Sequence, residues 1–157
     1  MKFYLIEEDK RKYLPLLLLA DEQESMITDN YDNPIYEDGK LLADLAKKYT
    51  APEGELLAAL DEDTVVGMVA YHRHSDDRCE MKRLYVKPDC RGSHLGRTLI
   101  GEILEHASRA GYKEMVLDTI EPLQAAIHLY REAGFQECEP YYDNPMEDVI
   151  YFKKELG

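Results

Sequence analysis

Two segments in the second half of the chain carry apolar residues at helical spacing. In the first, which begins at Leu95, the apolar positions include 95, 99, 100, 103, 104 and 107; in the second they are 123, 126, 127 and 130. This spacing places apolar side chains on one face of a helix. Gly111 is expected to end the first helix in the left-handed conformation, and Gly134 is expected to end the second helix. Pro122 precedes the second segment, where a proline in the first turn is tolerated.

Strand-like runs surround these two helices. The expected strands are Lys2–Glu7, Glu55–Leu60, Thr64–Arg73, Arg78–Val86, Glu114–Asp118, Phe135–Tyr141 and Asp148–Lys154. The acidic residues 61–63 separate the second strand from the third, which predicts a hairpin. Two more helices are expected at about 9–20 and 40–49, on either side of a polar, turn-rich segment. Since hairpins alternate with β-α-β units, the pattern predicts an α/β or α+β fold with a mixed sheet, in one domain over 1–157.

The charge and hydropathy of the chain exclude several classes of protein. A net charge of −13 opposes nucleic-acid binding, which depends on neutralisation of phosphates, and favours cationic small molecules only weakly. The longest apolar run, Leu14–Ala20, contains Pro15 and is far shorter than the roughly 20 residues that span a bilayer. It also lacks the flanks of a signal peptide. We therefore expect a cytoplasmic protein.

The cysteines and histidines give little support for a metal site. Cys79, Cys90 and Cys138 form no C-x-x-C pair, so neither a zinc site nor a disulfide framework is expected. Cys79 is interpreted as a small buried apolar residue, with a nucleophilic role as the alternative. His72 and His74 share one face of a strand, but no third ligand is apparent. We interpret them as surface residues, with a place in an acceptor site as the alternative.

The stretch Cys79–Gly101 is the most informative for chemistry. A strand leads through Pro88 and a glycine-bearing turn into a helix, whose first N–H groups have no intrahelical partners. Together with the helix dipole, such groups form an anion site, and Arg91 and Arg97 flank it. No Gly-Lys-Ser/Thr follows, so the turn is not a P-loop. The pattern predicts a pyrophosphate site that works without a metal.

Two motifs in this half of the chain resemble those of a known family. Arg91–Gly96 is similar to the coenzyme A signature Arg/Gln-x-x-Gly-x-Gly/Ala of the GCN5-related N-acetyltransferase (GNAT) superfamily. Ala125–Phe135, AAIHLYREAGF, resembles the second signature of that family. The tail PYYDNPMEDVIYFKKEL and the upstream YTAPEGELLAA resemble a bacterial branch of small GNATs. The resemblance covers roughly Tyr49–Leu156.

The resemblance implies a fold, a cofactor and a set of site residues. The implied fold is a mixed, mostly antiparallel sheet of about seven strands flanked by about four helices. The implied reaction is direct attack of an acceptor amine on acetyl-CoA in a ternary complex, with Tyr130 protonating the departing thiolate and Glu80 as general base, directly or through water. The pantetheine arm would be bound by the backbone of Leu84, Tyr85 and Val86, and the pyrophosphate by Arg91, Gly92, Ser93, His94, Leu95, Gly96 and Arg97.

Three features depart from these roles or leave them open. His94 occupies a position where the family has glycine; it either points outward from the first helical turn or serves as an additional cation near the phosphates. Leu123 stands where an asparagine is common. Glu80 is either the base, with a pKa raised by an apolar cleft, or a strand carboxylate paired with Lys82 or Arg83.

The acceptor is the least defined part of the prediction. Tyr31, Tyr36, Tyr142 and Asp143 lie in irregular segments that cover the acceptor pocket in this family, where they either contact the substrate or pack against the protein. We expect the acceptor to be a primary amine on a small molecule or an amino acid. A non-catalytic acyl-CoA sensor and a protein or peptide N-acetyltransferase are the alternatives. Dimerisation is common in the family, so a homodimer is also expected.

Overall fold

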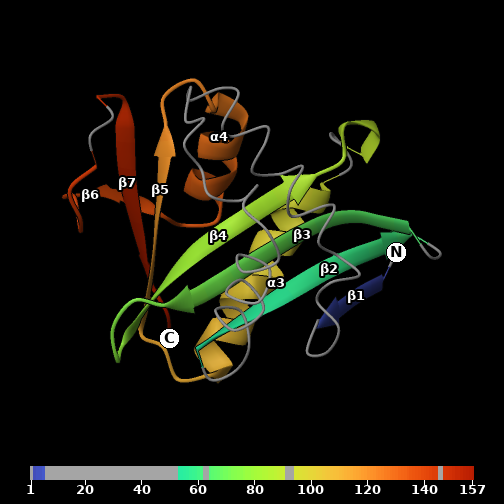
Figure 1. Ribbon diagram of the computed structural model, residues 1–157, viewed down its shortest axis with the longest axis horizontal. Helices are drawn as coiled ribbons and strands as arrows, with labels where there is room; N and C mark the ends of the chain where they lie inside the picture. The colour runs from blue at the N-terminus through green and yellow to red at the C-terminus, as the bar shows by residue number, and fades with distance from the viewer. Residues whose placement is uncertain (1, 6–52, 62–63, 91–93, 145–146) are drawn as a thin grey trace, which may run out of the picture.

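A computed structural model describes residues 2–5, 53–61, 64–90, 94–144 and 147–157. Seven strands form one sheet in the order β1-β2-β3-β4-β5-β7-β6 (Figure 1). The strands are β1 (Lys2–Leu5), β2 (Gly54–Asp61), β3 (Thr64–Arg73), β4 (Arg78–Val86), β5 (Glu114–Ile120), β6 (Gln136–Cys138) and β7 (Val149–Glu155). All neighbouring strands are antiparallel except β4 and β5, which are parallel. The predicted mixed sheet and the hairpin between β2 and β3 are confirmed.

The two helices predicted from periodicity are both present, as α3 (Leu95–Arg109) and α4 (Gln124–Glu132). Gly111 follows α3 with φ of 99°, which confirms its predicted left-handed conformation, and Gly134, which follows α4 as predicted, has φ of 101°. Pro122 does not lie in the first turn of α4, which begins two residues later. A 3-10 turn, η3 (Pro88–Cys90), connects β4 to the segment before α3.

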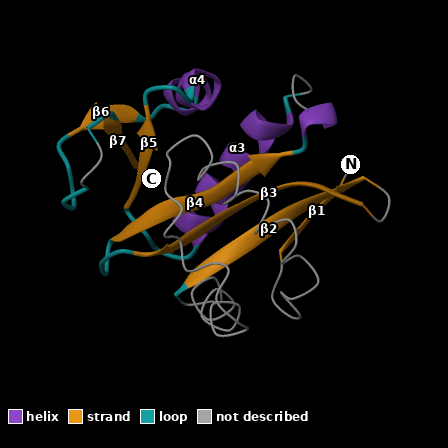
Figure 2. Ribbon diagram, turned by 45° about the horizontal axis from the view of Figure 1, so that its top comes forward, coloured by secondary structure: helices purple, strands orange, loops and turns teal. Residues whose placement is uncertain are grey.

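One face of the sheet packs against α3 and α4. Figures 1 and 2 show α3 behind β2, β3 and β4, and its buried residues join those of the strands in one apolar core. Tyr71, Cys79, Leu117 and Phe152 belong to this core. Because successive side chains on a strand point to opposite faces, the neighbours of these residues lie on the other face. That second face carries the polar residues His72, Glu80, Asp118 and Tyr151.

An irregularity in β4 interrupts this alternation. Met68 pairs with Tyr85 and Ala70 with Lys82, so two residues of β4, Arg83 and Leu84, stand opposite the single residue Val69. Arg83 has a φ of 63°, in the left-handed region. An extra residue of this kind is a β-bulge, which bends a strand and redirects side chains. Before the bulge the odd-numbered residues of β4 face the core, whereas after it Leu84 and Val86 pack against the core.

Some predicted boundaries are wrong, and others lie outside the described residues. The strand expected over Phe135–Tyr141 is only Gln136–Cys138, because Pro140 and the bend at 141–142 end its pairing with β7. The helices expected at about 9–20 and 40–49, and the segment between them, fall outside the described residues. No helix among the described residues is long and apolar enough to cross a membrane.

Candidate active site

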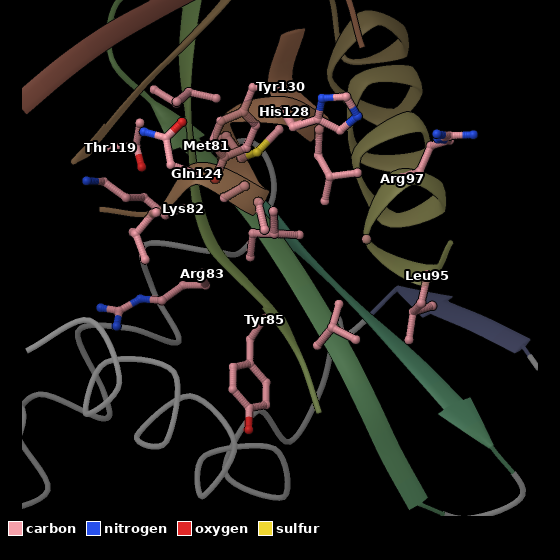
Figure 3. A pocket seen from close by; sticks show the side chains of 18 of the residues that line it. Met81, Lys82, Arg83, Tyr85, Leu95, Arg97, Thr119, Gln124, His128 and Tyr130 are labelled. Atoms are coloured by element: carbon pink, nitrogen blue, oxygen red, sulfur yellow. The ribbon is translucent and has the colours of Figure 1, made fainter. Parts of the chain in front are cut away.

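The divergence of β4 from β5 opens a pocket. These parallel strands pair only over Arg78–Glu80 and Glu114–Val116, after which they separate. The pocket has a volume of about 650 Å³, and it lies between the second half of β4, the end of β5, the start of α3 and α4 (Figure 3). Its described lining includes residues 81–86, 94–97, 117–119, 122–126 and 128–130. The pocket therefore brings together both sequence motifs.

The first turn of α3 forms one end of this pocket. Leu95, Gly96 and Arg97 line it. Their backbone N–H groups come before that of Thr98, which is the first to donate to an acceptor one turn back, His94 O. The first turn contains no acidic residue and no side-chain cap. Free N–H groups at a helix start, with the positive end of the dipole, favour an anion such as phosphate. Arg91, Gly92 and Ser93, the other predicted pyrophosphate ligands, fall outside the described residues.

The position of His94 differs from the expected first helical turn, whereas its role as an additional cation stays a prediction. It precedes the helix with φ of 66°, in the left-handed region, and does not lie in the first helical turn. Its side chain is exposed at the rim of the pocket. This backbone conformation explains why glycine suits the position, because a side chain adds steric strain there.

Replacing His94 with glycine is expected to stabilise the fold by about 0.5–1 kcal/mol, because relief of the left-handed strain exceeds the added chain entropy of glycine. Urea unfolding of both proteins measures the change. Ala110→Gly is the matched control: Ala110 has a φ of −74°, so glycine relieves nothing there and should destabilise. A loss of stability in the His94 variant as large as in the control would contradict the strain.

Arg97 is engaged with α4 in this structure. Its Nη2 donates to Glu132 Oε2 at 2.6 Å, and His128 Nε2 lies 2.9 Å from the other oxygen, Glu132 Oε1. These ion pairs lower the pKa of Glu132, chiefly through the hydrogen bond from Arg97. Both Arg97 and His128 line the pocket. Arg97 therefore places a positive charge near the start of α3, and its role as a pyrophosphate ligand stays a prediction.

The second half of β4 provides the wall for an extended ligand. Leu84, Tyr85 and Val86 line the pocket, on the edge of β4 that faces away from β3 and past the point where pairing with β5 ends. Beyond that point β4 does not pair with β5, so this edge of the strand faces the pocket. Such an edge, leading to a helix start suited to phosphates, fits the pantetheine arm and pyrophosphate of acetyl-CoA.

Tyr130 lies on α4 at the inner wall of the pocket (Figure 3). Its ring is buried and packs against Phe135 and Phe152, with centroid distances of 6.1 and 6.2 Å. Tyr130 therefore packs in the core and also lines the pocket. Rings held in this way keep the phenol oxygen at a fixed place, as a proton donor requires.

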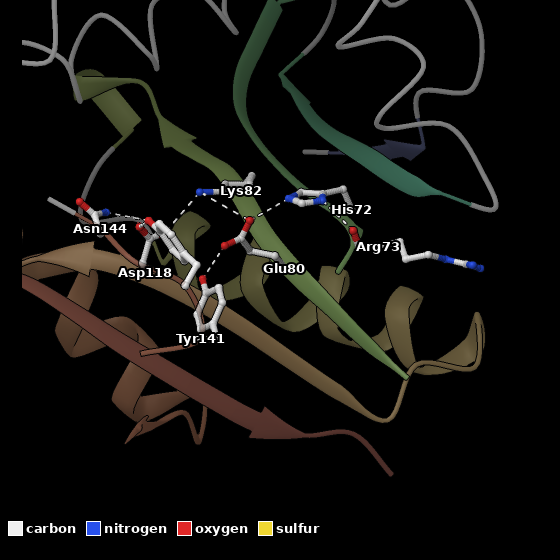
Figure 4. A network of polar contacts seen from close by, with 8 residues as sticks. His72, Arg73, Glu80, Lys82, Asp118, Tyr141 and Asn144 are labelled. Carbon is white, nitrogen blue, oxygen red and sulfur yellow. Dashed lines mark hydrogen bonds and ion pairs between the residues drawn. The ribbon is translucent and has the colours of Figure 1, made fainter. Parts of the chain in front are cut away.

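Glu80 lies on the opposite face of the sheet from the core, within a polar network (Figure 4). Its side chain is only 8% exposed, and Oε1 lies 2.8 Å from His72 Nε2 and 3.7 Å from Lys82 Nζ. Oε2 accepts a hydrogen bond from the Tyr141 hydroxyl. Burial alone would raise the pKa of Glu80, but the hydrogen bonds from His72 and Tyr141 and the charge of Lys82 lower it to about 2. The expectation of a raised pKa is therefore wrong.

His72 contacts Glu80 and is only 15% exposed, so its interpretation as a surface residue is wrong. Its Nδ1 lies 2.9 Å from the backbone oxygen of Arg73, while Nε2 faces Glu80. A carbonyl and an ionised carboxylate only accept, so both hydrogen bonds form together when both ring nitrogens carry hydrogen. His74 lies further along the chain, and its ring meets that of Tyr141 edge-on at 5.3 Å. Sequence reasoning placed these histidines on one face but gave no signal of the Glu80 contact.

A second group of polar residues continues the network towards the pocket. Lys82 Nζ lies 3.2 Å from Asp118 Oδ1, and the Tyr142 hydroxyl donates to Asp118 Oδ2 (Figure 4). Asn144 donates to the Tyr142 oxygen at 2.7 Å. Lys82 and Asp118 also line the pocket, so they connect it to Glu80. Sequence reasoning singled out neither as a site residue.

The residues predicted to bind the acceptor differ in their positions. Tyr142 joins the network, whereas Asp143 beside it is exposed and Tyr31 and Tyr36 fall outside the described residues.

Cys79 is fully buried in the core, and burial raises the pKa of its thiol to about 12, which confirms the apolar interpretation. Among the described residues, no cluster of three or more His, Cys, Asp or Glu could hold a metal.

The parallel strands β4 and β5 separate around a pocket that the start of α3 faces, which suits an extended ligand that ends in phosphates. The model of the acetyltransferase (GNAT) family matches residues 17–135. The chain is 45% identical over 118 residues to an uncharacterized N-acetyltransferase of Schizosaccharomyces pombe, covering 74% of this chain and 72% of that protein. The chain therefore belongs to the GNAT family of N-acetyltransferases.

Solved structures agree with this assignment. An acetyltransferase from Streptococcus agalactiae superposes with a TM-score of 0.78 at 24% identity, covering 98% of each chain. A GNAT family acetyltransferase from Elizabethkingia anophelis, solved with acetyl-CoA bound, has a TM-score of 0.60 at 21% identity over 78% of this chain and 87% of that one. At these identities the likeness shows the fold. The GNAT fold, the transferase class and acetyl-CoA as cofactor are thus confirmed, while the expected bacterial branch is not, since the yeast relative is eukaryotic.

Proposed function

We propose that this protein transfers an acetyl group from acetyl-CoA to a primary amine on a small molecule or an amino acid, by direct attack in a ternary complex. The observation that carries the proposal is that one pocket joins the start of α3, the second half of β4 and Tyr130. The polar residues Lys82 and Asp118 lie in the same pocket, where an acceptor needs polar partners. Acetyl-CoA supplies the acetyl group as an activated thioester.

Each residue has a distinct task in this proposal. The N–H groups of Leu95, Gly96 and Arg97 hold phosphate, and the backbone of β4 from Leu84 to Val86 orients the extended arm. Tyr130, held by its aromatic neighbours, donates a proton to the departing sulfur. Orientation of the two reactants in one pocket provides a large part of the rate enhancement.

Glu80 has a changed role in this proposal. A carboxylate with a pKa of about 2 is a weak base for an alkyl ammonium, whose pKa is near 10. Its buried negative charge instead holds His72, Tyr141 and Lys82 in place on the acceptor side of β4. We therefore propose Glu80 as a positioning residue. In this proposal no strong protein base removes the proton of the amine, and the pKa of the amine sets the fraction that can attack.

The pH–rate profile tests this role of Glu80. We expect kcat/KM to rise about tenfold per pH unit from pH 6.5 towards the pKa of the acceptor, because only the neutral amine attacks and no strong base assists it. Thiol release measured at constant ionic strength gives the profile. Acceptors with lower amine pKa should reach their plateau at correspondingly lower pH. A plateau that begins near pH 7 for every acceptor would instead indicate a protein base with a raised pKa.

The proposed activity is tested in two steps. Calorimetry with acetyl-CoA measures cofactor binding, and a panel of amines, amino acids and short peptides is then screened for accelerated release of coenzyme A. Acceleration by small amines or amino acids, but not by peptides, supports the proposal. If acetyl-CoA binds but no small acceptor accelerates release, the proposed acceptor class is wrong; release driven by peptides alone would favour the protein N-acetyltransferase alternative.

The cellular setting is part of the same proposal. All three cysteines are free, as thiols are in a reducing compartment, and this supports action in the cytoplasm. A homodimer remains a prediction, for which sedimentation of the purified protein is the test.

A further inference from the structure

Lys82 and Arg83 are consecutive on β4, yet both line the pocket. In a regular strand, neighbouring side chains point to opposite faces. The bulge at Arg83 and Leu84 breaks this rule, and Figure 3 shows Lys82 and Arg83 extending to the same side of β4, away from Arg97. The bulge thus brings two cationic side chains to one part of the pocket.

The charged side chains that line the pocket differ in balance from those of the whole chain. The chain carries a net charge of −13, whereas the Lys, Arg, Asp and Glu side chains that line the pocket are Lys82, Arg83, Arg97 and Asp118. Arg97 lies at the phosphate end, so the lining of the other end holds two cations and one carboxylate, and Glu80, outside the lining, is a second carboxylate beside Lys82. Lys82 is fixed between Asp118 at 3.2 Å and Glu80 at 3.7 Å, which keeps its ammonium in place.

Arg83 carries two features that each cost free energy, a left-handed backbone and a buried charge. Its backbone has a φ of 63°, which costs about 1–2 kcal/mol for a residue with a side chain. Burial lowers the pKa of its guanidinium to about 10, a value at which the group remains charged at neutral pH. A cation in a partly dehydrated pocket attracts an anion more strongly than one in water. Strained backbones and bulges of this type gather at binding sites.

We propose that the acceptor carries a carboxylate beside its amine, as an amino acid does, and that Lys82 and Arg83 bind this carboxylate. The inference rests on the proposed function and narrows its acceptor class. A guanidinium presents a planar fork of donors that matches a carboxylate, and the adjacent ammonium adds a second charge. Neutral or purely cationic amines lack this partner, so they should be poorer acceptors.

Matched acceptors test the proposal. L-amino acids and their carboxamides share the side chain and the amine, and differ in the charge of the carboxylate. We expect kcat/KM to be about ten- to a hundredfold higher for the acids, mainly through KM, as loss of one charge-assisted contact predicts. Removing the carboxylate also lowers the pKa of the amine, which by itself would favour the amide. A lower kcat/KM for the amide than for the acid would therefore be due to the lost contact with the carboxylate.

Variants of Lys82 test whether this residue causes the preference for acids over amides. Lys82→Met should reduce the acid-to-amide ratio several-fold, and Lys82→Arg, which keeps the charge, should restore most of it. Lys113→Met, which removes an exposed charge in the turn before β5, is the matched control and should leave the ratio unchanged. Equal use of acids and amides by the native protein, or an unchanged ratio in Lys82→Met, would overturn the proposal.

A binding measurement separates this proposal from the proposed function. Calorimetry in the presence of coenzyme A compares N-acetyl-L-alanine with its neutral amide. Tighter binding of the acid, weakened in Lys82→Met, supports the carboxylate site even if the amine screen finds no turnover. Equal binding of both compounds overturns it, whatever the screen shows.

Discussion

Replacing Tyr130 with phenylalanine is expected to lower kcat about a hundredfold while affinity for acetyl-CoA changes by less than about twofold. The variant keeps the ring that packs against Phe135 and Phe152 and removes only the hydroxyl that we propose as proton donor to the sulfur. A contact used only in the transition state lowers kcat and kcat/KM together. Steady-state thiol release gives both constants, and calorimetry gives the affinity.

The matched control for this variant is Tyr112→Phe. Tyr112 is also a buried tyrosine of the core, but it is absent from the pocket lining, and its oxygen accepts a hydrogen bond from Arg73 Nε at 3.3 Å. Its loss should affect stability without lowering kcat. A Tyr130 variant with native kcat, or one in which only KM rises, would remove the hydroxyl from the chemistry and leave Tyr130 as a core residue.

The secondary structure of the second half was accessible from the sequence because it depends on local spacing. Helices α3 and α4 show a clear apolar period, and glycines mark their ends. The hairpin of β2 and β3 follows from a short acidic interruption. The pocket was accessible for a different reason: its two motifs, around His94 and Tyr130, resemble those of a family whose fold places them together.

The electrostatics of the site could not be predicted from the sequence, because the donors that bind Glu80 lie on other elements. Glu80 receives its hydrogen bonds from His72 on β3 and from Tyr141, 61 residues away. Without these donors, an apolar setting would raise the pKa of Glu80; with them, it falls to about 2. The pairing of Lys82 with Asp118 likewise depends on how β4 and β5 separate.

The bulge in β4 was hidden for a related reason. The run from Arg78 to Val86 reads as one regular strand, and alternation would place Lys82 and Arg83 on opposite faces. The extra residue exists only relative to β3, where Val69 has two partners in place of one. No pattern within β4 itself indicates it. The acceptor side of the site is therefore the part that needed the structure.

Replacing Glu80 with glutamine is expected to lower the free energy of unfolding at pH 7 by about 3 kcal/mol. The folded protein holds the pKa of Glu80 at about 2, below the ordinary 4.5, because His72, Tyr141 and Lys82 stabilise the carboxylate. Since the folded value is the lower one, this stabilisation is complete above about pH 4.5 and is lost as the pH falls towards 2. The difference between native protein and variant should shrink over the same window.

Urea unfolding from pH 7 to pH 3 measures this difference, because urea is uncharged and does not screen the ion pairs. Asp76→Asn is the control: its side chain is 99% exposed and lies 3.8 Å from Arg73, so its loss should change the stability by less than about 0.5 kcal/mol at every pH. A Glu80 variant that is as stable as the native protein at pH 7, or whose deficit persists unchanged at pH 3, would contradict the low pKa. Glu80 would then again be a candidate general base, since burial of a carboxylate without strong partners raises its pKa towards neutral pH.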